Sequence, residues 1–113
     1  MPTNSQQLST LVNNTNDQQT VEENVYKLRE YLLKDYQQRG YNSELKVEIK
    51  KGRKYWKVIT DNSVHCFVDV NNGNVYKPAS WNKPAAIVRY NLIDNPQIVF
   101  ERCSWAGGYL YIR

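Results

Sequence analysis

The chain has 113 residues, of which 41% are hydrophobic and 12% aromatic, and its formal net charge at pH 7 is +4. This length and composition predict one globular domain with a modest core, and they exclude a chain that is disordered throughout. No apolar run approaches the roughly 20 residues that a membrane-spanning helix needs, so we expect no membrane partner.

The N-terminal segment is rich in Asn, Gln, Ser and Thr. It contains few bulky apolar residues, so it buries too little surface to offset the entropy of ordering. We therefore expect a flexible polar tail over residues 1–19 and a single folded domain over residues 20–113. The alternative is a tail that orders on a partner through Leu8, Leu11 and Val12.

The start of the chain also bears on the compartment. Residues 1–19 contain neither the basic nor the apolar region of a signal peptide, so we expect a protein of the reducing cytosol. Cys66 and Cys103 are then expected to be free thiols, the alternative being a disulfide.

A long helix is predicted from Thr20 to the neighbourhood of Gly40. Thr20 and Glu23 have the spacing of a capping box, in which a hydroxyl and a carboxylate satisfy unpaired backbone N–H groups. Apolar residues follow at steps of three and four, which is typical of one buried helical face. This face consists of Val21, Val25, Leu28, Leu32 and Tyr36. Gly40 is suited to end the helix in a left-handed conformation.

The hydrophobic period then changes from helical spacing to alternation, which predicts strands. An apolar, β-branched stretch has the composition of a central strand, and an Asn-Gly turn leads from it into a fourth strand that Pro78 ends. The predicted strands are residues 45–50, 55–60, 64–70 and 75–77. Together these elements predict an α+β fold in two layers, with one long N-terminal helix packed on an antiparallel sheet of four to five strands.

The last third of the chain is less regular. Pro84 suits the first position of a short helix that runs to about Tyr90. Residues 98–103 fit a strand or a helix. The alternating residues 109–112, which follow two glycines, predict a terminal strand.

The sequence offers no recognisable catalytic or metal-binding set. The single histidine, His65, adjoins Cys66, and neighbouring side chains on a regular strand point to opposite faces. Two cysteines and one histidine fall short of the four ligands of a structural zinc site. A hydrolase or nuclease would need Asp61, Asp69 and Glu101 to converge in a cleft. We therefore expect no enzyme and no cofactor.

Positive charge is concentrated in one predicted hairpin, residues 44–57. Its six Lys and Arg against two Glu give +4, which equals the net charge of the whole chain. Cations interleaved with an aromatic residue are typical of sheet surfaces that bind single-stranded nucleic acid. The predicted nucleic-acid-binding residues are Lys46, Lys50, Lys51, Arg53, Lys54, Tyr55 and Lys57. The alternative is a solvated sheet face whose lysines protect an edge strand from aggregation.

A second candidate contact is a loop that two prolines stiffen. It displays an aromatic residue among cations, the residue types that interface hot spots favour. The predicted partner-binding residues are Trp81, Lys83 and Arg89. The alternative, which we favour, is that Trp81 folds back over the open side of the sheet, because an exposed tryptophan is costly without a partner.

Several motifs resemble those of a family of small proteins with no assigned activity, encoded by tailed bacteriophages and some large DNA viruses. The similarity covers about residues 54–113. The matching segments are Phe67-Val68-Asp69, Gly73 to Trp81, Pro84-Ala85, Arg89 to Leu92 and Trp105 to Arg113. The resemblance implies a viral accessory or virion-associated protein made in the host cytoplasm, and it supplies no site residues.

These observations lead to two functional hypotheses. The first is a small non-enzymatic viral accessory protein that binds DNA or RNA through the hairpin 44–57. The alternative is a protein-interaction or virion structural module that uses the Trp81 loop and the aromatic C-terminus to bind a host or virion protein. Neither hypothesis specifies an oligomeric state.

Overall fold

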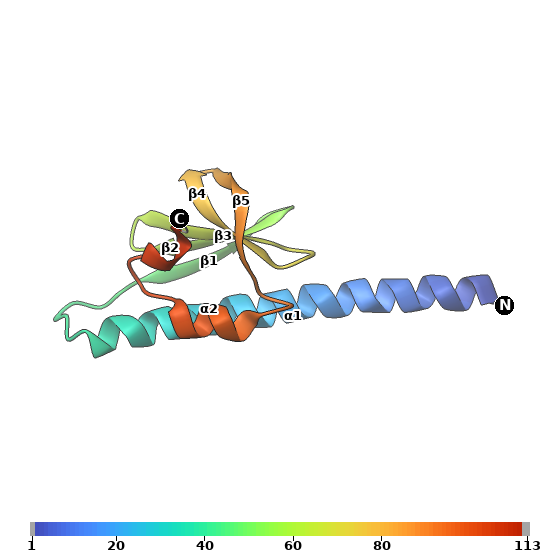
Figure 1. Ribbon diagram of the computed structural model, residues 1–113, viewed down its shortest axis with the longest axis horizontal. Helices are drawn as coiled ribbons and strands as arrows, with labels where there is room; N and C mark the ends of the chain where they lie inside the picture. Colours follow the sequence, from blue (N-terminus) through green and yellow to red (C-terminus); the bar gives the residue numbers. More distant parts are fainter. Residues whose placement is uncertain (1, 112–113) are drawn as a thin grey trace.

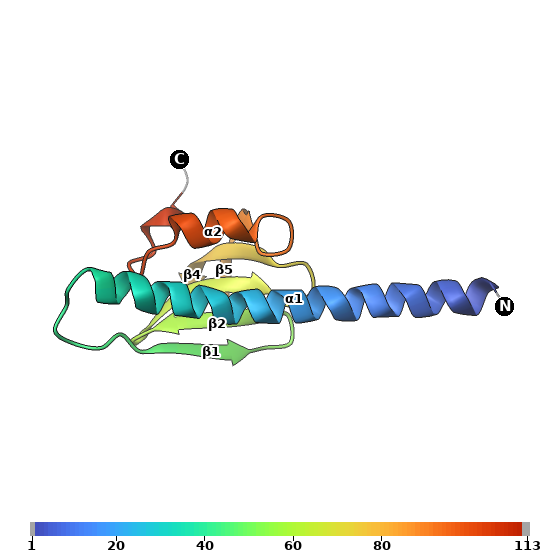
Figure 2. The same cartoon turned by 90° about the horizontal axis from the view of Figure 1, so that it is seen from below.

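The computed structural model describes the backbone of residues 2–111 and the side chains of residues 16–111. In chain order the elements are α1 (Pro2–Gln38), β1 (Val47–Lys51), β2 (Tyr55–Thr60), β3 (Ser63–Asp69), β4 (Asn74–Ser80), β5 (Lys83–Asn91), α2 (Pro96–Arg102) and the short 3-10 helix η1 (Gly108–Leu110). The strands form one antiparallel meander in the order β1-β2-β3-β4-β5. Both helices lie on one face of this sheet (Figures 1 and 2). The predicted two-layer α+β fold is therefore confirmed.

The core lies between α1 and the helix-facing side of the sheet, which we call the inner face. Val21, Val25, Leu28 and Leu32 are fully buried, so the predicted apolar face of the helix is confirmed. On the inner face they meet an apolar set from the strands: Val47, Trp56, Val58, Cys66, Val68 and Val75. Burial of these apolar surfaces is the main source of stability.

One polar contact fixes how α1 sits on the sheet. Asn24 is buried, and its Nδ2 donates a hydrogen bond of 2.6 Å to the backbone oxygen of Leu92. This bond satisfies two buried polar groups and joins the helix to the chain just beyond β5.

The predicted start of the helix at Thr20 is wrong. Residues 16–19 are helical, so Thr20 lies inside α1 and does not cap it. Once the packed part of a helix has formed, each added residue gains a backbone hydrogen bond at little further cost, so the helix extends past the apolar face. Most of the predicted tail, residues 1–15, lies outside the described side chains. The other end is confirmed: α1 stops at Gln38, and Gly40 has a φ of 77°.

The last third of the chain departs from the prediction in two strands. Residues 83–91 form β5 and not a short helix, and β4 continues through Pro78 to Ser80. Pro78 lies opposite Pro84, at a point where the register is irregular. Pro84 is tolerated because β5 is an edge strand, and Pro78 is tolerated because the pairing of β4 with β3 ends at Tyr76.

The C-terminal segment covers the part of the sheet that α1 leaves open. Residues 96–102 form α2, with Pro96 in its first turn and Val99 and Phe100 buried, which decides between the strand and helix alternatives. The predicted terminal strand over 109–112 is wrong, because residues 108–110 form η1 and Leu110 is buried. Two glycines before Tyr109 allow a tight turn that brings Leu110 into the core. Ile112 lies outside the described residues.

Alanine at Gly73 is expected to lower the free energy of unfolding by about 2 kcal/mol, because alanine is strained at positive φ and the site has no room for it. Gly73 has a φ of 75°, and a Cβ there would lie 3.2 Å from the Ile93 nitrogen and 3.3 Å from Cγ2 of Val21. Urea unfolding measures the loss. Gly40→Ala is the matched control, since Gly40 has a φ of 77° and open space around it. Equal losses in the two variants would contradict the role assigned to crowding.

Candidate functional site

The face of the sheet that points away from the helices carries a row of side chains across all five strands. We call this side the outer face. Lys50 lies opposite Lys57, Lys57 opposite Phe67, Phe67 opposite Tyr76, and Tyr76 opposite Val88. Directly opposed residues of an antiparallel pair share a face, so the row is continuous. The predicted outward orientation of Lys50, Tyr55 and Lys57 agrees with this register.

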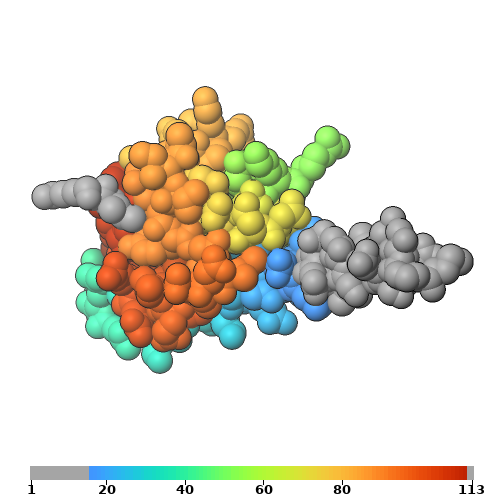
Figure 3. Space-filling view, turned by 45° about the vertical axis from the view of Figure 1, so that its right-hand side comes forward, coloured from blue at the N-terminus to red at the C-terminus, as the bar shows by residue number. Residues whose placement is uncertain are grey.

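A groove of about 270 Å³ lies at one end of this row. It is bounded by the β1–β2 hairpin and by the turn between β4 and β5, which lie together on the outer side of the sheet (Figure 3). The residues that line it are Lys50, Lys51, Gly52, Arg53, Lys54, Tyr55, Lys57, Phe67 and Asn82. Five of these are cations and none is acidic. We call this feature the basic groove.

The cations of the basic groove are not neutralised from within the sheet. Lys50 and Lys57 are directly opposed, and like charges in that position destabilise a sheet. The ion pairs of the described residues involve Arg29, Arg39 and Lys46, none of which lines the groove. The arrangement therefore suits an anionic ligand that supplies the missing negative charge.

Aromatic rings form the floor of the basic groove. The ring centroid of Tyr55 lies 6.0 Å from that of Phe67 and 5.8 Å from that of Tyr76, and both pairs meet edge to face. Phe67 is only 3% exposed, so this cluster is a packed support. Lys54 and Lys57 lie over the rings of Tyr55 and Phe67, with their Nζ atoms 5.4 Å and 5.8 Å from the centroids.

Trp81 lies at the rim of the basic groove. It is 48% exposed, so the interpretation that it folds back over the sheet is wrong. The place that it would fill is already occupied by Tyr55, Phe67 and Tyr76. Instead, Lys57 holds the turn: its Nζ lies 4.8 Å from the centroid of Trp81 and donates a hydrogen bond of 2.9 Å to Oδ1 of Asn82.

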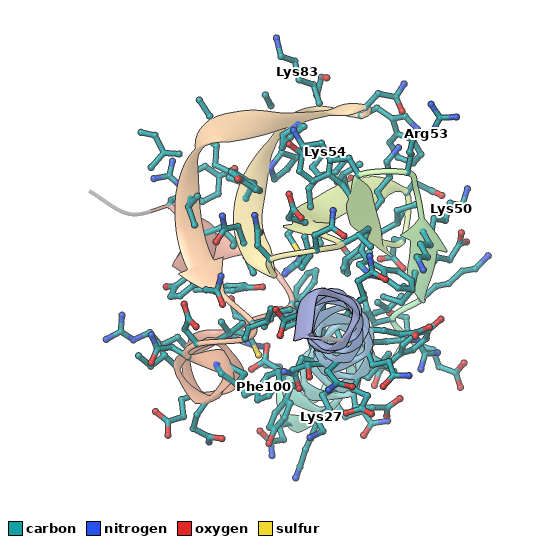
Figure 4. The ribbon with its side chains drawn as sticks, turned by 90° about the vertical axis from the view of Figure 1, so that its right-hand side faces the viewer. Lys27, Lys50, Arg53, Lys54, Lys83 and Phe100 are labelled. Atoms are coloured by element: carbon teal, nitrogen blue, oxygen red, sulfur yellow. The ribbon has the colours of Figure 1, made fainter. Side chains whose placement is uncertain are left out.

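Not every predicted site residue lies at the basic groove. Lys46 precedes β1, far from the hairpin tip, and pairs with Glu48 at 3.1 Å. Lys83 is exposed at the start of β5, on the same side of the sheet as Lys50, Arg53 and Lys54 (Figure 4). Arg89 is six residues further along β5, roughly 20 Å from Lys83 at the usual rise per strand residue. Arg89 is therefore not a neighbour of Trp81.

Three residues that line the basic groove were absent from the predicted site: Gly52 of the hairpin turn, Phe67 and Asn82. Phe67 could have been found, because alternation along residues 64–70 puts it on the same face as Lys57 once the register is known. Asn82 carries no such signal, since its position depends on how the β4–β5 turn reaches toward β2.

Charge is divided between the two layers of the molecule. Residues 47–91 contain eight Lys and Arg against three Asp and Glu, a balance of +5. Residues 16–38 of α1 contain three Lys and Arg against five Asp and Glu, a balance of −2. Figure 4 shows Lys50, Arg53, Lys54 and Lys83 on the side away from α1, whereas Lys27 points the opposite way.

His65 and Cys66 lie together in the interior, contrary to the expectation that they face opposite sides. The β2–β3 register shifts between Val58 and Ile59, which leaves His65 as an extra residue and interrupts the alternation. Nε2 of His65 lies 2.7 Å from the hydroxyl of Tyr109. Burial lowers the pKa of His65 to about 4, although a hydrogen bond with the Trp105 backbone opposes the shift. The imidazole is therefore neutral at pH 7.

The two cysteines are free, and their surroundings make them weak nucleophiles. Burial raises the pKa of Cys66. Burial, followed by the nearby charge of Asp35, raises the pKa of Cys103 to about 11. Both thiols are therefore protonated at neutral pH, and the thiolate is the reactive form. Among residues 16–111, no three His, Cys, Asp or Glu side chains are grouped to hold a metal ion.

The comparison with known families gives one match. The model of the Family of unknown function (DUF7717) matches residues 6–112. The chain belongs to this family. No curated protein and no solved structure matches it. Within the part of the chain that is described, no helix is long and apolar enough to cross a membrane. The DUF7717 match includes both hairpins that bound the basic groove.

Proposed function

We propose that this chain is a small non-enzymatic viral accessory protein that binds nucleic acid through the basic groove. The observation that carries the proposal is the set of five cations around Tyr55 in a groove with no acidic lining residue. The viral origin rests on the sequence resemblance over residues 54–113. The non-enzymatic character rests on two features: burial keeps His65 away from the surface, with its Nε2 at the Tyr109 hydroxyl, and the raised pKa values of Cys66 and Cys103 keep both thiols protonated.

Phosphate groups match the chemistry of the basic groove. Lysine offers a point charge, and the fork of Arg53 can bind two phosphate oxygens at once. Binding of this kind releases counterions, so the affinity falls with salt. If the five cations each neutralise one phosphate, a log–log plot of affinity against salt has a slope of about −3.5 for a single strand.

A second candidate function is protein interaction, through a surface next to the basic groove. The β4–β5 hairpin exposes Trp81 at 48%, Ile87 at 63% and Val88 at 43%. Exposed apolar groups of this kind mark partner surfaces. The predicted aromatic C-terminus contributes Tyr111, which is 63% exposed with Lys77 over its ring at 4.4 Å, whereas Tyr109 is tied to His65. The partner in this case would be a host or virion protein, and its binding would be tolerant of salt.

A binding titration tests the proposed function. Labelled single-stranded and double-stranded DNA and RNA are titrated with the protein at about 50 and about 200 mM salt, where roughly 100-fold weakening is expected for a single strand. Fluorescence anisotropy reports the dissociation constant. Absence of binding at the lower salt concentration would refute the proposal, and salt-independent binding would favour the protein-interaction alternative.

A further inference from the structure

Phosphate binding does not account for the exposure of Trp81. The ring is held in place, because Lys57 lies 4.8 Å from its centroid and also bonds the neighbouring Asn82. A lysine over the ring covers one face, and the residue nevertheless remains 48% exposed. The turn between β4 and β5 therefore presents a fixed aromatic surface to the solvent at the rim of the basic groove.

The other rings at the basic groove cannot serve as a contact surface of this kind. Phe67 is 3% exposed. Tyr55 is half-buried, its edge-to-face contacts with Phe67 and Tyr76 restrict it, and Lys54 lies over its ring. Trp81 is thus the one well-exposed aromatic ring beside these cations among the described residues.

We propose that the basic groove selects single-stranded nucleic acid, with one unpaired base stacked on Trp81 and the adjoining phosphates bound by the β1–β2 hairpin. This inference rests on the proposed function. Bases inside a duplex stack on each other and present only their edges, whereas an unpaired base offers its face. A strand bound in this way runs from Arg53 and Lys54 across Lys57 to Trp81. Lys51 contributes less, because it lies opposite Trp56 of the inner face and its Nζ is 5.4 Å from that ring.

The competing hypothesis is that the protein binds a duplex, with the same β1–β2 hairpin in contact with a different part of the nucleic acid. A two-stranded ribbon fits the major groove of DNA, so the tip at Lys51, Arg53 and Lys54 would enter it. Trp81 would then have no base face to contact. The two arrangements therefore differ in what loss of the Trp81 ring does.

The test compares the wild-type chain with Trp81→Ala and Trp81→Phe on a single-stranded homopolymer and on a duplex of equal length. Trp81→Ala is expected to weaken single-strand binding about 10- to 100-fold, the usual effect of losing one stacked base, and to leave duplex binding unchanged. Trp81→Phe is expected to retain most of the affinity. Ile87→Ala is the matched control, since it removes an apolar side chain that is 63% exposed on the same hairpin.

Intrinsic fluorescence provides a second, independent measurement. Stacking of a base on Trp81 is expected to quench the emission of the wild-type chain, and Trp81→Phe is expected to bind without this quenching. If the wild-type chain binds a duplex as tightly as a single strand, or if Trp81→Ala binds the single strand unchanged, this inference is overturned while the proposed function stands. If the wild-type chain binds no nucleic acid at low salt, the proposed function fails and the inference fails with it.

Discussion

Replacement of Lys50, Lys51, Arg53 and Lys54 by glutamate is expected to abolish nucleic-acid binding. All four line the basic groove, and each substitution changes the charge by two, so the net charge falls by eight from +4 to −4. Phosphates would then meet like charges at the place where counterion release otherwise drives binding. Anisotropy with a labelled single strand at low salt measures the loss. All four residues are exposed, so circular dichroism is expected to show an unchanged fold.

A second variant with the same net charge separates the basic groove from the charge of the whole molecule. Its substitutions to glutamate are placed on exposed cations of the helical side: Lys27, Lys34, Arg39 and Arg102. This variant is expected to retain most of the binding, because it leaves the basic groove intact. Equal loss in the two variants would show that net charge, and not the groove, governs binding. Intact binding in the groove variant would rule out the groove as the site.

Acidification from pH 6.5 to about pH 4 is expected to lower the free energy of unfolding by about 3 kcal/mol through His65 alone. The imidazole binds a proton below about pH 6.5 in the unfolded chain and below about pH 4 in the folded protein, where burial disfavours its charged form. Between these values the unfolded chain holds the additional proton, so stability falls as the pH falls. Above pH 6.5 the contribution is fully present.

Urea unfolding at several pH values measures this dependence. The slope between pH 6.5 and pH 5 is assigned to the single histidine by comparison with a variant that lacks it. His65→Gln removes the titrating group, and its unfolding free energy is expected to be flat over that range. The same slope in the wild-type chain and in His65→Gln would disprove the assignment.

Local patterns were sufficient to predict the packed part of α1 and the presence of the first four strands, but not the start of α1 or the end of β4. The apolar face from Val21 to Tyr36 repeats at helical spacing, and residues 45–70 alternate or are apolar throughout, so neighbouring residues determine the element. β5 was mispredicted because Pro84 suits both the first turn of a helix and an edge strand. The edge position became clear only from the pairing of β5 with β4, which is a long-range contact.

The candidate site could be predicted only in part, because local patterns determine one hairpin but not the contacts between distant strands. Six of the seven predicted nucleic-acid-binding residues line the basic groove, because they lie within one hairpin whose two strands are adjacent in sequence. The contact between Lys57 and Trp81 joins β2 to the β4–β5 turn and depends on the curvature of the whole sheet. Arg89 was grouped with Trp81 by sequence distance, whereas β5 is extended and separates them.

The division of charge between the two layers bears on the kinetics of association. With +5 over the segment that contains the strands and −2 along α1, the molecule has an electric dipole directed across its thickness. In the field of a polyanion the protein would rotate to present its outer face before contact. A larger fraction of encounters would then be correctly oriented for binding. The association rate constant is then expected to fall with ionic strength as the Debye length shortens below the dimensions of the domain. The acidic residues of the distant helix thus help to orient the encounter although they never contact the ligand.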